Sequence, residues 1–139
     1  WQVQRADCPQ RAGALGGAVA SGRHLTFKPR LTQSRYLVKN FTINSMIDIS
    51  DGLSSDLGHI LEKSIAGAVL DEGSLPVSKG SSLKDALSEG EDFELLFTLP
   101  QKEAEKLPAE IDGVKLTRIG KISKKGRGSA PAPGGYSHF

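Results

Sequence analysis

The sequence has little of what several common classes of protein need. Its single cysteine, Cys8, has no second cysteine with which to form an internal disulfide. Its three histidines are scattered, which excludes a zinc site of closely spaced Cys and His ligands. No run approaches the roughly 20 apolar residues of a membrane-spanning helix, and residues 1–5 lack the apolar core of a secretion signal. We therefore expect a cytoplasmic protein without membrane contact, whose chemistry rests on carboxylates, hydroxyls or backbone groups.

Aromatic content and charge limit the partners further. Only 6% of the residues are aromatic, and the basic residues of 121–127 fit no known nucleic-acid-binding motif, so we expect no nucleic-acid partner. Residues 1–45 hold seven basic residues and one acidic residue, and residues 46–113 hold five basic and fifteen acidic residues. Residues 114–139 hold six basic residues and no acidic residue. The acidic middle suits metal coordination, although charges segregated in this way also occur as plain solvated surface.

Helical and strand patterns alternate along the chain and predict an α/β (α+β) fold, with helices packed on a sheet. The best helix has Leu53, Leu57, Ile60 and Leu61 on one face. The expected helices are 31–41, 53–61, 83–87 and 101–107, and the expected strands are 43–49, 67–70, 93–98 and 114–119. Residues 1–30 show weak periodicity around a glycine turn, and the last sixteen residues read as a loop or tail.

The sharpest site is Ile-Asp-Ile-Ser-Asp-Gly-Leu at 47–53, where a strand ends directly before a helix. Asp48 and Asp51 can converge on one point there, while the free N–H groups of the helix face an anion. Mg²⁺ prefers hard oxygen ligands such as carboxylates and phosphates, so the pair predicts a magnesium site. In the alternative, Ser50 or Asp51 only caps the helix and Asp48 is a polar strand end.

A second acidic cluster, Glu91, Asp92 and Glu94, follows a turn at Gly90. Carboxylates this close repel one another, and a cation or a positively charged ligand would neutralise them. Alternate strand residues share a face, so Asp92 and Glu94 are expected to project together while Glu91 points away. The alternative is a solvated loop edge.

Taken in order, these two motifs resemble the thiamine-monophosphate kinase family of the AIR-synthase-like ATP-binding superfamily. They read Asp-Ile-Ser-Asp-Gly-Leu at 48–53 and Gly-Glu-Asp-Phe-Glu-Leu-Leu-Phe at 90–97. The resemblance implies an AIR-synthase-like C-terminal domain with a mixed sheet of about four or more strands. It divides the chain into a remnant of the interdomain junction (1–22), that domain (23–123) and a Gly/Pro-rich tail (124–139).

The resemblance also implies a reaction, in which ATP and Mg²⁺ convert thiamine monophosphate to thiamine diphosphate. Asp48 and Asp51 would be magnesium ligands, Ser50 would contact ATP, and Arg5 would match a nucleotide-contacting arginine. Such a site suits phosphoryl transfer, which is catalysed mainly by positioning and by cations that neutralise phosphate charge.

The substrate side of the implied site comes from two other segments. Glu91, with Asp92 beside it, would face the cationic thiazolium of thiamine monophosphate. Tyr136 would take the place of a family aromatic that packs on the substrate.

The chain also departs from that family. Family members are considerably longer, and their N-terminal domain supplies further aspartates and most of the ATP site. The segment 5–13 is expected to lack the strand that normally precedes the glycine turn. We therefore expect a C-terminal kinase domain with little or no activity as a lone chain. Two other readings stay open, which are a non-catalytic ligand-binding or protein-interaction domain and a domain that associates as a homodimer or with a separate N-terminal domain.

Overall fold

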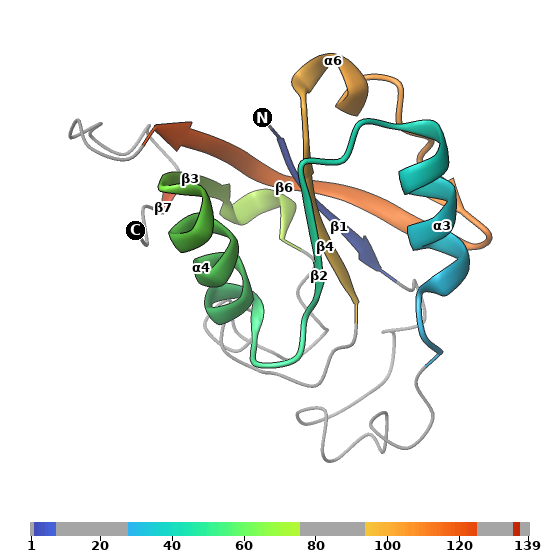
Figure 1. Ribbon diagram of the computed structural model, residues 1–139, viewed down its shortest axis with the longest axis horizontal. Helices are drawn as coiled ribbons and strands as arrows, with labels where there is room; N and C mark the ends of the chain where they lie inside the picture. The colour runs from blue at the N-terminus through green and yellow to red at the C-terminus, as the bar shows by residue number, and fades with distance from the viewer. Residues whose placement is uncertain (1, 8–27, 76–93, 125–134, 137–139) are drawn as a thin grey trace.

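One antiparallel sheet organises the part of the chain that the computed structural model describes, namely residues 2–7, 28–75, 94–124 and 135–136 (Figure 1). Its strands are β1 (Gln2–Asp7), β2 (Ser45–Asp48), β3 (Ala66–Asp71), β4 (Leu95–Leu99), β5 (Glu110–Ile111), β6 (Val114–Lys124) and β7 (Gly135–Tyr136). The helices of the described part are α3 (Leu31–Asn40), α4 (Leu53–Ser64), the 3-10 helix η2 (Glu72–Ser74) and α6 (Gln101–Ala104). The strand order is β2-β4-β1-β6-β3-β7, and β5 pairs with β6. The expected α+β class is confirmed, but every pairing between described strands is antiparallel rather than mixed.

The two longer helices cover opposite faces of the sheet. Successive side chains of a strand point to opposite faces, and all five residues of β4 are buried. Leu96 packs in one hydrophobic cluster with Leu57 of α4. Phe97 and Leu99 pack in a second cluster with Leu37 of α3. Figure 1 accordingly shows α4 on one side of β2 and β4 and α3 on the other.

Both residues that flank α4 have a positive φ, which few residues other than glycine adopt. The residue before the helix is Gly52, at φ 105° and ψ 149°, a conformation that glycine adopts without steric cost. The helix ends at Ser64 and is followed by the capping residue Ile65, which is left-handed at φ 49° and donates its N–H to the Leu61 and Glu62 carbonyls. The expected helix 53–61 is therefore confirmed and runs three residues further.

The N-terminal strand β1 was missed by the sequence analysis. The expectation of no strand before the glycine turn was wrong, because β1 pairs with β4 on one side and β6 on the other. Its residues are mostly polar, and only Val3 and Ala6 carry an apolar side chain, so no strand pattern stands out. The register shifts at Val3/Gln4, which leaves Ile119 of β6 as an extra residue in a bulge. The division at residue 22 stays a prediction, but residues 2–7 lie within the sheet.

The remaining expected elements divide into three groups. Helix α3 and strands β2, β3, β4 and β6 are confirmed within a few residues, and the helix expected at 101–107 is limited to Gln101–Ala104. The expected helix 83–87 lies outside the described residues. Within the expected tail, Gly135–Tyr136 instead forms a strand paired with β3. No helix in the described part is both long and apolar enough to cross a membrane.

Candidate functional site

The turn between β2 and α4 places the predicted metal ligands at one end of the sheet. Asp48 is the last residue of β2, pairs with Leu95 and has an exposed side chain. The chain then stays anchored to β4, because the Ile49 N–H donates to the Glu94 carbonyl at 2.8 Å. Ile49 itself is fully buried, whereas Asp51, two residues later, is exposed. A buried residue thus separates two exposed carboxylates.

The capping alternative is wrong for this turn. No side chain caps the first turn of α4, and the residue at the cap position is Gly52. The hydrogen bonds run the other way, from the backbone of the turn to the helix. The N–H groups of Ser50 and Asp51 both donate to one carboxylate oxygen of Asp56, at 2.9 and 3.1 Å. The Asp51 carboxylate therefore has no capping role to explain its presence.

Asp51 lies beside two residues of α4 that the sequence analysis did not single out. One carboxylate oxygen each from Asp51 and Asp56 and one imidazole nitrogen of His59 lie within 4.8 Å of one another. Asp56 is buried and His59 is exposed. Asp48 is not part of this group. The i, i+3 spacing of Asp56 and His59 on a helix was the available signal, since residues so spaced share a face.

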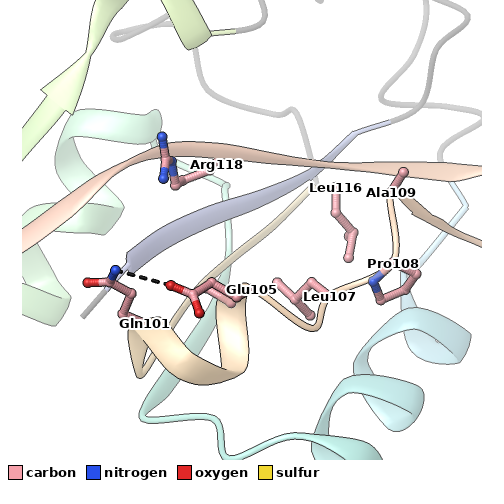
Figure 2. Close-up of a pocket in the computed structure, with 8 residues that line it drawn as sticks. Gln101, Glu105, Leu107, Pro108, Ala109, Leu116 and Arg118 are labelled. Atoms are coloured by element: carbon pink, nitrogen blue, oxygen red, sulfur yellow. Dashed lines mark hydrogen bonds between the residues drawn. The ribbon is translucent and has the colours of Figure 1, made fainter.

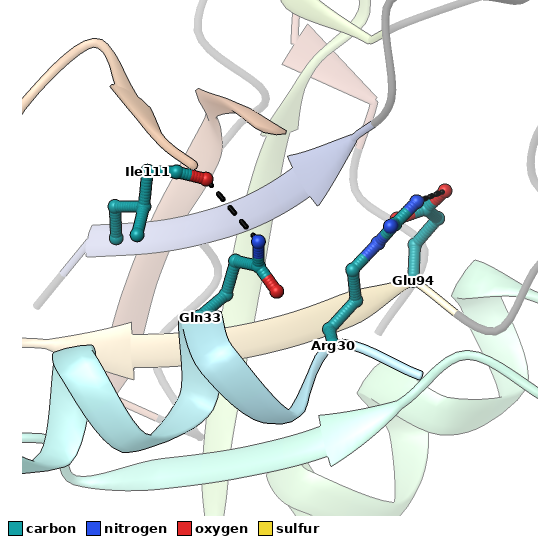
Figure 3. A network of polar contacts seen from close by, with 4 residues as sticks. All are labelled: Arg30, Gln33, Glu94 and Ile111. Atoms are coloured by element: carbon teal, nitrogen blue, oxygen red, sulfur yellow. Dashed lines mark hydrogen bonds and ion pairs between the residues drawn. The ribbon is translucent and has the colours of Figure 1, made fainter. Parts of the chain in front are cut away.

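The second acidic cluster is resolved at Glu94 alone, since Glu91 and Asp92 lie outside the described residues. The Glu94 side chain is 1% exposed, so the solvated-edge alternative is wrong for it. The Arg30 guanidinium donates two hydrogen bonds to its carboxylate, at 2.8 and 2.9 Å, as Figure 3 shows. The expected neutralising cation is therefore supplied, for this carboxylate, by the residue before α3.

A second polar contact in Figure 3 holds α3 on its face of the sheet. The buried side-chain amide of Gln33 donates to the carbonyl of Ile111 in β5, at 3.2 Å. Together with the Arg30–Glu94 pair it fixes the first turn of α3 above β4 and β5. These contacts connect α3 to the strand end from which the segment containing Glu91 and Asp92 departs.

The two remaining predicted site residues lie in strands at different distances from the turn. Arg5 of β1 pairs with Leu96 of β4, which pairs in turn with Ile47 of β2, so its backbone is at the level of the β2–α4 turn. Two strand spacings separate the two backbones, about 10 Å. Tyr136 of β7 pairs with Leu70 of β3, at the edge of the strand order opposite to β2. The strand order therefore brings Arg5, and not Tyr136, near Asp48.

An open pocket of about 320 Å³ lies at the other end of β4 (Figure 2). It is lined from α6 through Ala109 and by two residues of β6, Leu116 and Arg118. Its Glu105 accepts a hydrogen bond from Gln101 at 3.2 Å. None of the predicted site residues lines it, so the pocket is separate from the β2–α4 turn.

Comparison with known proteins gives consistent matches. A family model described as AIR synthase related protein, C-terminal domain, matches residues 2–132. The thiamine-monophosphate kinase of Rhodopirellula baltica is 38% identical over 120 residues, which are 79% of this chain and 38% of that protein. The thiamine-monophosphate kinase of Escherichia coli K12 is 42% identical over 111 residues, 73% of this chain and 34% of that protein.

Solved structures agree with the sequence comparisons. The crystal structure of thiamine-monophosphate kinase from Stenotrophomonas maltophilia K279a is 26% identical and has a TM-score of 0.67. The match covers 88% of this chain and 47% of that one, so this chain spans less than half the length of each of these relatives. Since the family model covers almost the whole described sheet, the chain belongs to the family of AIR synthase related proteins, as their C-terminal domain.

Proposed function

We propose that this chain contributes the C-terminal part of a thiamine-monophosphate kinase site, which transfers a phosphoryl group from ATP to thiamine monophosphate. The observation that supports this most is the β2–α4 turn. It leaves Asp48 and Asp51 exposed at a strand end and holds the backbone between them in place. The relatives at 38% and 42% identity carry the name of this kinase.

The residues of the turn fit Mg²⁺ by their donor chemistry. Exposed carboxylates are hard oxygen ligands, and Mg²⁺ is commonly held by one or two of them together with substrate phosphates. Asp48 and Asp51 would hold the ion, and Ser50 would contact ATP. Bound there, Mg²⁺ would neutralise phosphate charge during transfer. On the substrate side we propose Glu91, Asp92 and Tyr136, and we propose Arg5 as a further nucleotide contact.

The lone chain is expected to bind weakly and to turn over little or not at all. Two carboxylates leave most of the six magnesium positions to water, and binding tightens only when phosphates fill some of them. The chain spans only 34–38% of the length of its curated kinase relatives.

Titration with Mn²⁺-ATP, followed by NMR line broadening, tests the proposed metal turn. Mn²⁺ accepts the same oxygen ligands as Mg²⁺ and broadens the resonances of nearby amides. We expect broadening of residues 48–52 in the unaltered chain and at least a tenfold loss of affinity in Asp51→Ala. Glu62→Ala is the matched control, because it removes one exposed acid from α4, the helix that follows the turn, and should bind like the unaltered chain.

Two results would contradict the proposal. Equal binding by Asp51→Ala and the unaltered chain would remove the turn from the site. An absence of broadening at 48–52, even at millimolar Mn²⁺-ATP, would favour the alternative of a non-catalytic interaction domain. Steady formation of thiamine diphosphate by the 139-residue chain alone would contradict the expected inactivity.

A further inference from the structure

We infer that Asp56 is a positioning residue, whose buried carboxylate holds the Ser50 and Asp51 backbone so that Asp51 and Ser50 face the metal and the nucleotide. The inference rests on the proposed function of the turn. It adds a residue that takes part without touching the ligand.

The hydrogen bonds that Asp56 accepts hold the backbone of the β2–α4 turn in one conformation. Two consecutive backbone N–H groups, those of Ser50 and Asp51, donate to the same carboxylate oxygen, at 2.9 and 3.1 Å. Hydrogen bonds to a charged acceptor are about twice as strong as neutral ones. Because the two bonds fall on neighbouring peptide groups, they restrict the rotation of the backbone that carries the Asp51 side chain.

The Asp56 carboxylate, which accepts these hydrogen bonds, is itself held in place by the packing of α4. Asp56 is 2% exposed and lies in the first turns of α4, where its own N–H donates to the Gly52 carbonyl at 3.0 Å. Leu53 and Leu57 on either side of it are fully buried in the core. The turn is therefore attached to the packed part of the helix rather than held by exposed side chains.

Burial and hydrogen bonding distinguish the role of Asp56 from that of Asp51, which lies beside it in space. Asp51 is exposed, whereas Asp56 is buried and one of its oxygens already accepts two hydrogen bonds. Residues that orient metal ligands in this way typically change metal affinity by 10- to 100-fold when they are replaced. The competing reading is that Asp56 is itself a ligand within the Asp51–Asp56–His59 group.

Two substitutions separate positioning from ligation. Asp56→Ala removes the acceptor, and Asp56→Asn keeps an acceptor oxygen in place but removes the charge that a ligand needs. We expect Asp56→Ala to weaken Mn²⁺-ATP binding at least tenfold and to speed hydrogen exchange of the Ser50 and Asp51 amides at least tenfold. We expect Asp56→Asn to bind within about threefold of the unaltered chain.

The controls address stability. Leu61→Ala removes a buried side chain from the far end of α4 and should lower the melting temperature without changing binding. Ser55→Ala changes an exposed neighbour and should change neither. If Asp56→Ala does not fold, Asp56→Ser replaces it, since a serine hydroxyl is too short to reach both amides.

Several results would overturn the inference. They are binding by Asp56→Ala within threefold of the unaltered chain, a loss in Asp56→Asn as large as in Asp56→Ala, and an equal loss in Leu61→Ala. If Asp51→Ala weakens binding and Asp56→Ala does not, the inference fails and the proposed function stands. If the unaltered chain does not bind Mn²⁺-ATP, the proposed function fails and the inference fails with it.

Discussion

At the scale of single residues, the Arg30–Glu94 pair shows how the fold accommodates a charge in its interior. The Glu94 side chain is 1% exposed and the Arg30 side chain 12%, and two hydrogen bonds join them. Removal of one member of a buried ion pair strands the other in a medium of low dielectric. Because Glu94 directly precedes β4, the ion pair also holds the start of this strand next to the first turn of α3.

Arg30→Ala is expected to lower the free energy of unfolding by about 3 kcal/mol, because it leaves the Glu94 carboxylate buried without this partner. Urea denaturation measures the change. In a double-mutant cycle, Arg30→Ala combined with Glu94→Gln should cost clearly less than the sum of the two single changes. Strict additivity would show that the two side chains do not interact.

The sequence was sufficient to propose a candidate site but not to show how the backbone of that site is held in place. Asp48, Asp51 and Gly52 lie within five consecutive residues, so a strand pattern followed by a helix pattern marks the turn that they form. The role of Asp56 depends on where the Ser50 and Asp51 N–H groups point, which no periodicity reports. Glu94 and Arg30 are 64 positions apart, and only the packing of α3 against β4 brings them together.

At the scale of elements, local patterns succeed where both the cause and the effect are local. The hydrophobic face of α4 lies within one stretch of sequence, and the helix was predicted correctly. The hairpin of β5 and β6 was not predicted, although its signal is also local, since Asp112 and Gly113 have φ of 50° and 72°, as a type I′ turn requires. The sequence did not predict β1, because the place of this strand depends on two partner strands, β4 and β6, that come much later in the chain.

Two glycines of β6 and its hairpin should respond differently to alanine. A Cβ at Gly120 would meet the Val69 carbonyl and lie 3.0 Å from the Leu70 Cα, so β3 must move away from β6. A Cβ at Gly113 meets nothing within 4 Å, and only its φ of +72° is unfavourable. We expect a loss of about 3 kcal/mol for Gly120→Ala and about 1 kcal/mol for Gly113→Ala.

Thermal and urea unfolding of the two variants measures this difference. Hydrogen exchange adds a local readout, because amides of β3 should lose protection in Gly120→Ala and keep it in Gly113→Ala. Equal stability losses in the two variants would show that the β3–β6 contact is more compliant than its backbone separation indicates.

At the scale of the whole molecule, β1 joins two halves of the sheet. On one side lie β4 and β2, and on the other lie β6, β3 and β7. Val3 is fully buried in the cluster that α4 covers. Without β1 the facing edges of β4 and β6 would lose their backbone partners, and unpaired backbone groups in the interior are costly.

A chain that lacks residues 1–7 is therefore expected not to fold. The measurement is the dispersion of its amide resonances together with near-ultraviolet circular dichroism, and both should indicate loss of fixed tertiary packing. A synthetic peptide of residues 1–7, added in excess, should restore part of the dispersion. Native-like spectra of the shortened chain without peptide would contradict the assigned place of β1.

The position of β1 also has a consequence for the order of events during synthesis. Its residues leave the ribosome well before their partners, because Val3 pairs with Thr98 of β4 and with Gly120 of β6, which are made much later. The sheet can close only after β6 has been released, and such distant pairings slow folding. Until then the edges of β1, β2 and β3 are available to other chains, so the nascent protein is a candidate client for chaperones that bind unpaired strands.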